Sequence, residues 1–196
     1  MAYLLTALNR YQEEIRKSRF IAIAAPVADA KAAQAFLTEH SDAAASHNCW
    51  AWLCGAQYRF SDDGEPGGTA GKPILSAIQH QGFDNTAVLV IRYYGGIQLG
   101  TGGLARAYGG CANKCLQSAA RVELIKHICA DCYVPFTELN RVQARLGLWQ
   151  ARIVHEAYDA NGAQLVLELP EAQLALAALQ LKDLSRGSIV LKARPL

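Results

Sequence analysis

The chain after residue 127 alternates between two hydrophobic spacings, and this alternation restricts the fold more than any other feature of the sequence. The apolar run over 128–136 is typical of a buried strand in its length and in the Pro135 near its end. From Glu138 onward the apolar residues recur at helical spacing, at Leu139, Val142, Leu146 and Trp149. Strand-like composition returns over 153–158. The turn residues Asn161-Gly162 then precede an apolar/polar alternation over 163–169, which predicts a strand with one buried face.

A second helix and a short strand complete this pattern. Apolar residues over 174–184 follow the helical period, and Gly187 precedes a strand predicted over 188–193. The predicted order is therefore βαββαβ. This is the ferredoxin-like arrangement, in which both helices cover one face of a four-stranded antiparallel sheet.

The part of the chain before residue 120 is less regular and predicts a mixed α/β domain. Charged residues over 120–127 separate its apolar pattern from the one that follows. We therefore expect an α+β protein with two domains, 1–124 and 128–196. The elements expected in the first domain are strands at 19–25, 48–54 and 87–94 and helices near 28–40 and 102–119.

Charge and hydropathy restrict the class of partner. The chain of 196 residues carries 19 Lys and Arg against 17 Asp and Glu, and the excess of cations lies before His127. Its isoelectric point near 8.2 is below the value of roughly 9 at which nucleic-acid binding becomes the default interpretation. No run of eighteen uncharged apolar residues is present, so we expect a cytoplasmic protein without a membrane partner.

The six cysteines are predicted to be reduced, because a chain that is 52% hydrophobic does not need disulfides to fold. Cys129 and Cys132 have the spacing of zinc ligands, but alternation along a strand sends them to opposite faces. Cys111 and Cys115 share one face of the expected helix and are predicted to lie in the core.

No metal, cofactor or catalytic residue is predicted. His47, Cys49 and Cys54 are interpreted as packing residues rather than as ligands. The carboxylates of Asp62, Asp63 and Glu65 could hold a hard cation such as Mg²⁺, but solvated acids of a turn are the preferred interpretation. No G-x-S-x-G or other nucleophile motif is present, so we expect that the protein is not an enzyme.

The first glycine-rich segment, FSDDGEPGGTAGKPIL over 60–75, invites comparison with a phosphate-binding loop. Such a loop needs a glycine and a hydroxyl residue at the positions that Pro66 and Pro73 occupy. The segment is therefore predicted to be a structured, turn-rich loop.

The second glycine-rich segment follows the strand expected at 87–94. Gly100, Gly102 and Ala105 match G-x-G-x-x-A, but the motif begins several residues after the strand, and no acidic residue for a ribose is evident. A helix start at Thr101-Gly102-Gly103, with Arg106 one turn inside, favours an anion such as phosphate or carboxylate. Close packing of a glycine-faced helix is an equally good interpretation.

Four segments together resemble the IMPACT/YigZ family: KSRFIA, HNCWAW, the segment over 60–75, and VIRYYGGIQLGTGGLARAYG. The resemblance covers essentially the whole chain. It implies a first domain with the βαβ fold of ribosomal proteins and of domain IV of elongation factor G, including a left-handed crossover. It also implies a second, ferredoxin-like domain similar to the C-terminal part of elongation factor G, and a link to the control of translation.

These features favour a translation-linked regulatory or binding protein that contacts RNA or ribosome-associated surfaces. Arginines and lysines would hold phosphates, and one of the adjacent residues Tyr93 and Tyr94 would stack on a base. The two tyrosines cannot both do so, since neighbouring strand residues face opposite ways. A protein-interaction module without nucleic acid, and an enzyme or sensor with an anion pocket, remain alternatives. The candidate binding residues are Lys17, Arg19, Lys72, Arg92, Tyr94, Thr101, Gly102, Gly103 and Arg106.

Overall fold

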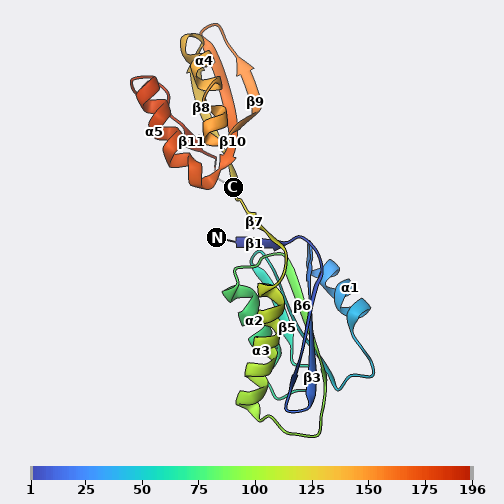
Figure 1. Cartoon of the computed structure of the whole chain (residues 1–196). Coiled ribbons are helices and arrows are strands. Elements are labelled where there is room, and N and C mark those ends of the chain that lie inside the picture. The colour runs from blue at the N-terminus through green and yellow to red at the C-terminus, as the bar shows by residue number, and fades with distance from the viewer. Residues whose placement is uncertain (1, 195–196) are drawn as a thin grey trace. The chain divides into compact units, whose positions relative to one another are not determined.

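The computed structural model describes residues 2–194 and divides the chain into two compact units, the first ending at Leu124 and the second beginning at Ile125 (Figure 1). Each unit combines an antiparallel sheet with helices. The predicted α+β fold class is therefore confirmed.

The first unit is built on a five-stranded sheet in which every pair of neighbouring strands is antiparallel. Because β6 lies between β3 and β4, those two strands are parallel, and α1 (Ala30–His40) connects them as a split βαβ unit. The same relation holds for β5 and β6, which α2 (Gly71–His80) connects. The handedness of these crossovers stays a prediction. In sheet order the strands are β2 (Asn9–Ile15), β3 (Ser18–Pro26), β6 (Thr86–Tyr93), β4 (His47–Cys54) and β5 (Gln57–Ser61).

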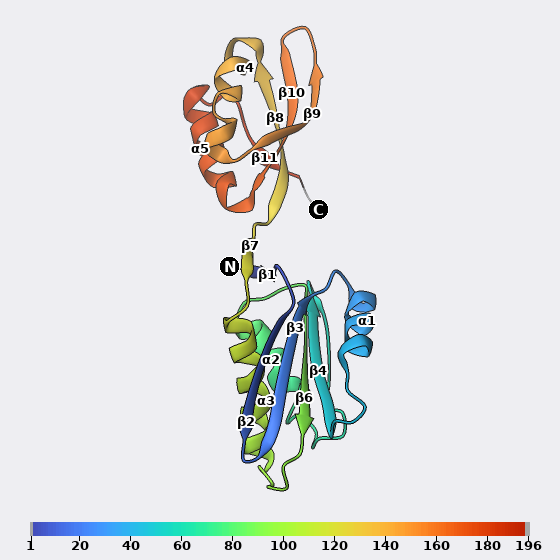
Figure 2. The ribbon, with the colours of Figure 1, turned by 45° about the vertical axis from the view of Figure 1, so that its right-hand side comes forward.

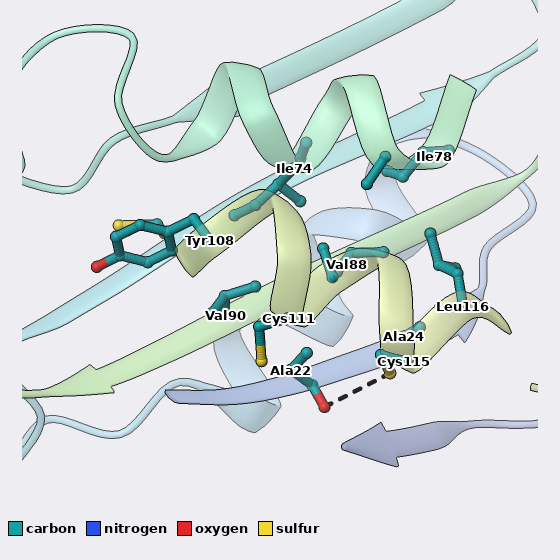
Figure 3. Close-up of a cluster of buried hydrophobic side chains, with 14 of the residues drawn as sticks. Ala22, Ala24, Ile74, Ile78, Val88, Val90, Tyr108, Cys111, Cys115 and Leu116 are labelled. Carbon is teal, nitrogen blue, oxygen red and sulfur yellow. Dashed lines mark hydrogen bonds between the residues drawn. The ribbon is translucent and has the colours of Figure 1, made fainter. Parts of the chain in front are cut away.

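Helices cover both faces of this sheet, with α1 on one face and α2 and α3 (Thr101–Gln117) on the other (Figure 2). The central strand β6 is therefore buried on both sides, which explains its apolar run. Figure 3 shows Cys111 and Cys115 of α3 pointing toward the sheet, where the Cys115 Sγ lies 3.6 Å from the Ala22 carbonyl oxygen. The predicted core position of these two cysteines is confirmed.

The first unit also contains a second sheet of two strands. β1 (Ala2–Leu5) pairs in antiparallel register with β7 (Arg121–Leu124). The charged segment that was predicted to separate the two domains therefore forms a strand of the first one over part of its length.

Five elements of the first unit were not predicted: the strands β1, β2, β5 and β7 and the helix α2. The segment over 60–75 is not a loop throughout, since it contains the end of β5 and the start of α2. The sequence did not predict that helix, because proline is disfavoured in the interior of a helix. Pro73 lies in the first turn of α2, where the missing backbone N–H costs no helical hydrogen bond.

The second unit has the predicted βαββαβ order and a four-stranded antiparallel sheet with strand order β11-β8-β10-β9. The helix expected from Glu138 to Trp149 is divided at 144–145 into α4 and a short 3-10 helix. The final strand is shorter than expected. The elements are β8 (His127–Pro135), α4 (Phe136–Gln143), η1 (Leu146–Trp149), β9 (Arg152–Tyr158), β10 (Gly162–Pro170), η2 (Glu171–Gln173), α5 (Leu174–Leu184) and β11 (Lys192–Ala193).

The core of the second unit lies between its helices and one face of its sheet. Trp149 is fully buried there, and its indole N–H donates a 2.7 Å hydrogen bond to Gln180. Cys132 points into this core while Cys129 is partly exposed, as the alternation along the strand predicts. All six cysteines are free thiols.

Candidate ligand-binding site

The first unit contains a cavity of about 590 Å³ where β6 ends and α3 begins. Its walls come from four segments: the start of β4, the loop after β5, the loop after β6 and the first turn of α3. The residues that line it are Ser46, His47, Glu65, Pro66, Arg92, Tyr94, Gln98, Leu99, Gly100, Thr101 and Leu104.

A buried ion pair forms one wall of this cavity. Nη1 of Arg92 donates a 2.6 Å hydrogen bond to Oε1 of Glu65, and the two side chains are 6% and 4% exposed. Nη2 of Arg92 lies 3.4 Å from the Ser18 hydroxyl, a weak contact, and Nε is buried without a hydrogen-bond partner among the described residues. The guanidinium is therefore neutralised by Glu65 but keeps unused donor capacity.

Glu65 was predicted to be a solvated acid of a turn, and that prediction is wrong. Its carboxylate is held inward by Arg92 and by the Tyr108 hydroxyl, which donates a 2.6 Å hydrogen bond to the same Oε1. Two donors from β6 and α3 compensate for the loss of water around the charge. Nε2 of His47 also approaches Oε1, at 3.8 Å.

The loop that delivers Glu65 is organised by its neighbour Asp62. The Asp62 carboxylate accepts hydrogen bonds from the backbone N–H groups of Gly68, Ala70 and Gly71 at 2.8–2.9 Å. Burial raises the pKa of Asp62, but these three donors outweigh it and lower the pKa below its ordinary value of 3.8. Asp62 is therefore a structural anchor, whereas Asp63 is exposed as expected.

The thiol of Cys49 lies behind the same cluster. Burial raises the pKa of Cys49 to about 12, and the carboxylates of Glu65, Asp63 and Asp62 add to the shift. Burial also raises the pKa of Tyr108 well above its usual range. Both groups are therefore protonated at neutral pH, and Cys49 is no nucleophile there.

The loop after β6 forms the outer wall. Gly95 is required because a Cβ there would lie 1.9 Å from the Lys17 carbonyl oxygen, which fixes the loop against the turn between β2 and β3. Tyr94 precedes it and is 49% exposed. The Arg92 guanidinium lies 5.3 Å from the centre of the Tyr94 ring.

The N-terminus of α3 lies at the rim of the cavity. Gly100 precedes the helix with φ +71° and provides no side-chain cap. The backbone N–H groups of Thr101, Gly102 and Gly103 therefore have no intrahelical acceptor, as at any helix start, and can bind an anion. Close packing, the alternative interpretation of these glycines, also applies: a Cβ on Gly103 would lie 3.1 Å from the Leu99 Cβ, and further along α3 a Cβ on Gly109 would lie 3.3 Å from Pro73.

A second, smaller groove of about 250 Å³ lies beside the first and shares Leu99 with it. It is lined by Ile15, Arg16, Leu99, Gly103, Arg106 and Ala107. Arg16 and Arg106 are exposed, and neither forms an ion pair with any residue in the described range 2–194. We call the surface formed by Arg16, Lys17, Arg106 and the N-terminus of α3 the α3-end surface.

The binding residues that the sequence predicted do not all lie at one place in the structure. Arg92, Tyr94 and Thr101 lie at the cavity, and Gly103 and Arg106 lie at the smaller groove. Gly102 lies in the first turn of α3, next to Arg106. Nη1 of Arg106 lies 3.6 Å from the position that a Cβ on Gly102 would occupy.

Lys17, Arg19 and Lys72 lie outside both hollows. Lys17 belongs to the turn between β2 and β3 and is part of the α3-end surface, although it does not line the smaller groove. Arg19 stacks at 4.2 Å on Tyr93, on the sheet face that α1 covers. Lys72 is exposed in the first turn of α2, whose Pro73 packs against the middle of α3.

Sequence reasoning missed Arg16, and it missed the partnership of Glu65 with Arg92. One pattern could have revealed the buried arginine. Val88, Val90 and Arg92 alternate along β6 on the face that points to α3, so Arg92 follows two core residues and needs a buried acid.

Two kinds of feature are absent from residues 2–194. No helix in this range is long and apolar enough to cross a membrane. No cluster of three or more His, Cys, Asp or Glu residues in the same range has the geometry to hold a metal ion.

Comparison with known families gives two matches. The Impact N-terminal domain matches residues 16–116, and a domain of unknown function, DUF1949, matches residues 132–188. Both matches follow the division of the chain into two units.

Curated proteins and solved structures agree with these matches. The chain is 45% identical to "IMPACT family member in pol 5'region" of Thermus thermophilus over 89% of this chain and 97% of that protein. It is 42% identical to "IMPACT family member YigZ" of Escherichia coli K12, over 92% of each protein. A crystal structure of a hypothetical protein, 39% identical, superimposes with a TM-score of 0.61 over 99% of this chain and 97% of the other.

Proposed function

The chain belongs to the IMPACT family, and we propose that it is a translation-linked, cytoplasmic binding protein that contacts RNA through the α3-end surface. The family resemblance supports the link to translation. The charge distribution of the first unit supports RNA as the partner.

One observation carries the proposal. Arg16 and Arg106 come from segments ninety positions apart in the sequence, yet they line one groove and have no acidic partner among the described residues. The positive end of the α3 dipole points to the same place. The β2–β3 hairpin and the start of α3 lie at the same end of this unit (Figure 2). Such a cluster of unneutralised donors suits the phosphates of a nucleic-acid backbone.

The proposal differs from the prediction made from sequence in the residues that carry it. Arg92 is not a phosphate contact of the surface, because Glu65 neutralises it. Arg19 and Lys72 are also left out, since they lie away from the groove. Arg16 joins Lys17, Thr101, Gly102, Gly103 and Arg106.

We propose binding without catalysis. The cavity is lined by an acid and an imidazole, and the Cys49 thiol, which does not line it, is kept protonated at neutral pH by burial. The Glu65 carboxylate is held by Arg92 and Tyr108. This arrangement provides hydrogen-bond acceptors and shape, and it provides no activated nucleophile.

Fluorescence anisotropy with a labelled single-stranded RNA at low salt tests the proposal. Arg106→Ala is expected to weaken binding about equally for RNAs of different sequence, because a phosphate contact carries no base information. The matched control is Arg59→Ala, an exposed arginine on the edge strand β5 without an ion pair among the described residues. Equal affinity of the wild type and Arg106→Ala would reject the proposed surface.

A further inference from the structure

We propose that the 590 Å³ cavity binds a single nucleoside monophosphate unit, with guanine as the base that fits its polar wall. If the bound nucleotide is part of an RNA chain, the inference rests on the proposed function. If it is a free nucleotide, the inference is independent of that function. Its basis is the combination of an aromatic wall, a buried carboxylate with a free oxygen and a helix N-terminus around one hollow.

The size and lining of the cavity suit one nucleotide. Cavities that bury a small ligand are typically about 300–1,000 Å³ and carry a few convergent polar groups on an apolar lining. Leu99, Leu104 and Pro66 supply apolar walls, and Glu65 and Gln98 supply the polar groups. The ligand must therefore have a flat or apolar body with hydrogen-bonding edges.

Tyr94 provides a face for the base. Its ring is 49% exposed although it lines the cavity, and the Arg92 guanidinium lies near the ring at 5.3 Å from its centre. An exposed aromatic ring beside a planar cation is a surface on which bases stack. Tyr93, which could not face the same way, is occupied on the opposite face of the sheet by Arg19.

Glu65 favours a base with N–H donors. The hydrogen bonds from Arg92 and Tyr108 both reach Oε1, and no described residue donates to Oε2. A carboxylate can accept from several donors, so Oε2 is available to a ligand. The Watson–Crick edge of guanine presents two adjacent donors, whereas uracil presents one N–H between two carbonyl oxygens that would face the carboxylate.

The phosphate would lie at the rim. Thr101 lines the cavity at the first position of α3, where the backbone N–H groups have no intrahelical acceptor. A phosphate there meets the positive end of the helix dipole. The buried pair of Arg92 and Glu65 has no net charge, so the anion is held at the rim and the base enters the cavity.

Isothermal titration calorimetry of the full chain with GMP, UMP and inorganic phosphate tests the inference. One GMP per chain is expected to bind, UMP is expected to bind more weakly, and phosphate alone is expected to give no binding in the same concentration range. Tyr94→Ala should weaken GMP binding on the order of tenfold or more, while Tyr94→Phe retains the stacking face and should bind as the wild type does.

Tyr58→Ala is the matched control, since Tyr58 is 54% exposed on β5 and does not line the cavity. Thr101→Pro removes one rim N–H at a position where proline is tolerated and should also weaken GMP binding. The inference is overturned if GMP does not bind, if Tyr94→Ala binds as well as the wild type, or if phosphate binds as tightly as GMP. Equal affinity for GMP and UMP would overturn the placement of the base at Glu65.

The same variants separate this inference from the proposed function. RNA binding that depends on Arg106 but not on Tyr94, without GMP binding, would overturn the inference and leave the RNA surface in place. GMP binding that depends on Tyr94, without RNA binding, would support the inference, identify the ligand as a free nucleotide and reject the RNA role.

Discussion

Arg92 and Glu65 form a buried ion pair across 27 positions of sequence, with Nη1 of the arginine 2.6 Å from Oε1 of the glutamate. The pair joins the end of the central strand to the glycine-rich loop after β5. It therefore determines the shape of the cavity wall, and its removal should affect both stability and ligand binding.

Glu65→Ala is expected to lower the free energy of unfolding of the first domain by about 3–5 kcal/mol, because it leaves the Arg92 charge buried without a partner. The double variant Glu65→Ala with Arg92→Met should be more stable than the single variant, since no unpaired charge remains. Urea unfolding measures both. Arg59→Ala is the control, since Arg59 is exposed on β5 of the same domain without an ion pair among the described residues, and its replacement should change the stability by no more than about 0.5 kcal/mol. A cost of the single variant no greater than that of the control would contradict the structural role.

Asp62→Asn is expected to destabilise the first domain by about 1–3 kcal/mol at pH 7, because three backbone N–H groups lose their charged acceptor. The pKa of Asp62 is lowered in the folded state, so its stabilisation is complete above its ordinary value of 3.8. It is lost as the pH falls through the folded-state pKa. The difference in stability between wild type and variant should therefore shrink in acid. Thermal unfolding from pH 7 down to pH 3 measures it, and a difference that grows in acid would reverse the assigned sign.

Residues 125–196 are expected to fold alone, because their sheet has the complete strand order β11-β8-β10-β9 and a core of its own. Trp149 is the one tryptophan in this part of the sequence and is fully buried, so its fluorescence reports on folding. A cooperative thermal transition of the isolated segment is predicted. A gradual, non-cooperative change in the segment, with a sharp transition in the full chain, would show that this domain depends on the first one.

The second domain was predictable because its helices and strands are amphipathic. The alternation over 163–169 and the helical spacing over 174–184 correspond to β10 and α5. The divided helix and the two-residue final strand depend on packing that local periodicity does not contain.

The first domain was less predictable because its chemistry lies in long-range pairs. Glu65 follows glycines and acids that are typical of a solvated turn, and only its contact with a residue of β6 makes it a buried group. Likewise, Arg16 and Arg106 meet through the tertiary fold, which no spacing in the sequence expresses. The helix start at 101–103 could be predicted from its glycines. The residues that lie beside it in the folded chain could not.

The salt dependence of RNA binding tests the proposed RNA contact at the α3-end surface most directly. For single-stranded RNA, the logarithm of the binding constant should fall with the logarithm of salt concentration by roughly 0.7 per phosphate contact. Arg106→Ala should flatten that slope by about one contact, and adding Arg16→Ala should flatten it by about one more, while Arg59→Ala leaves it unchanged. Slopes that are the same in all four proteins, or an affinity that does not depend on salt, would contradict the account.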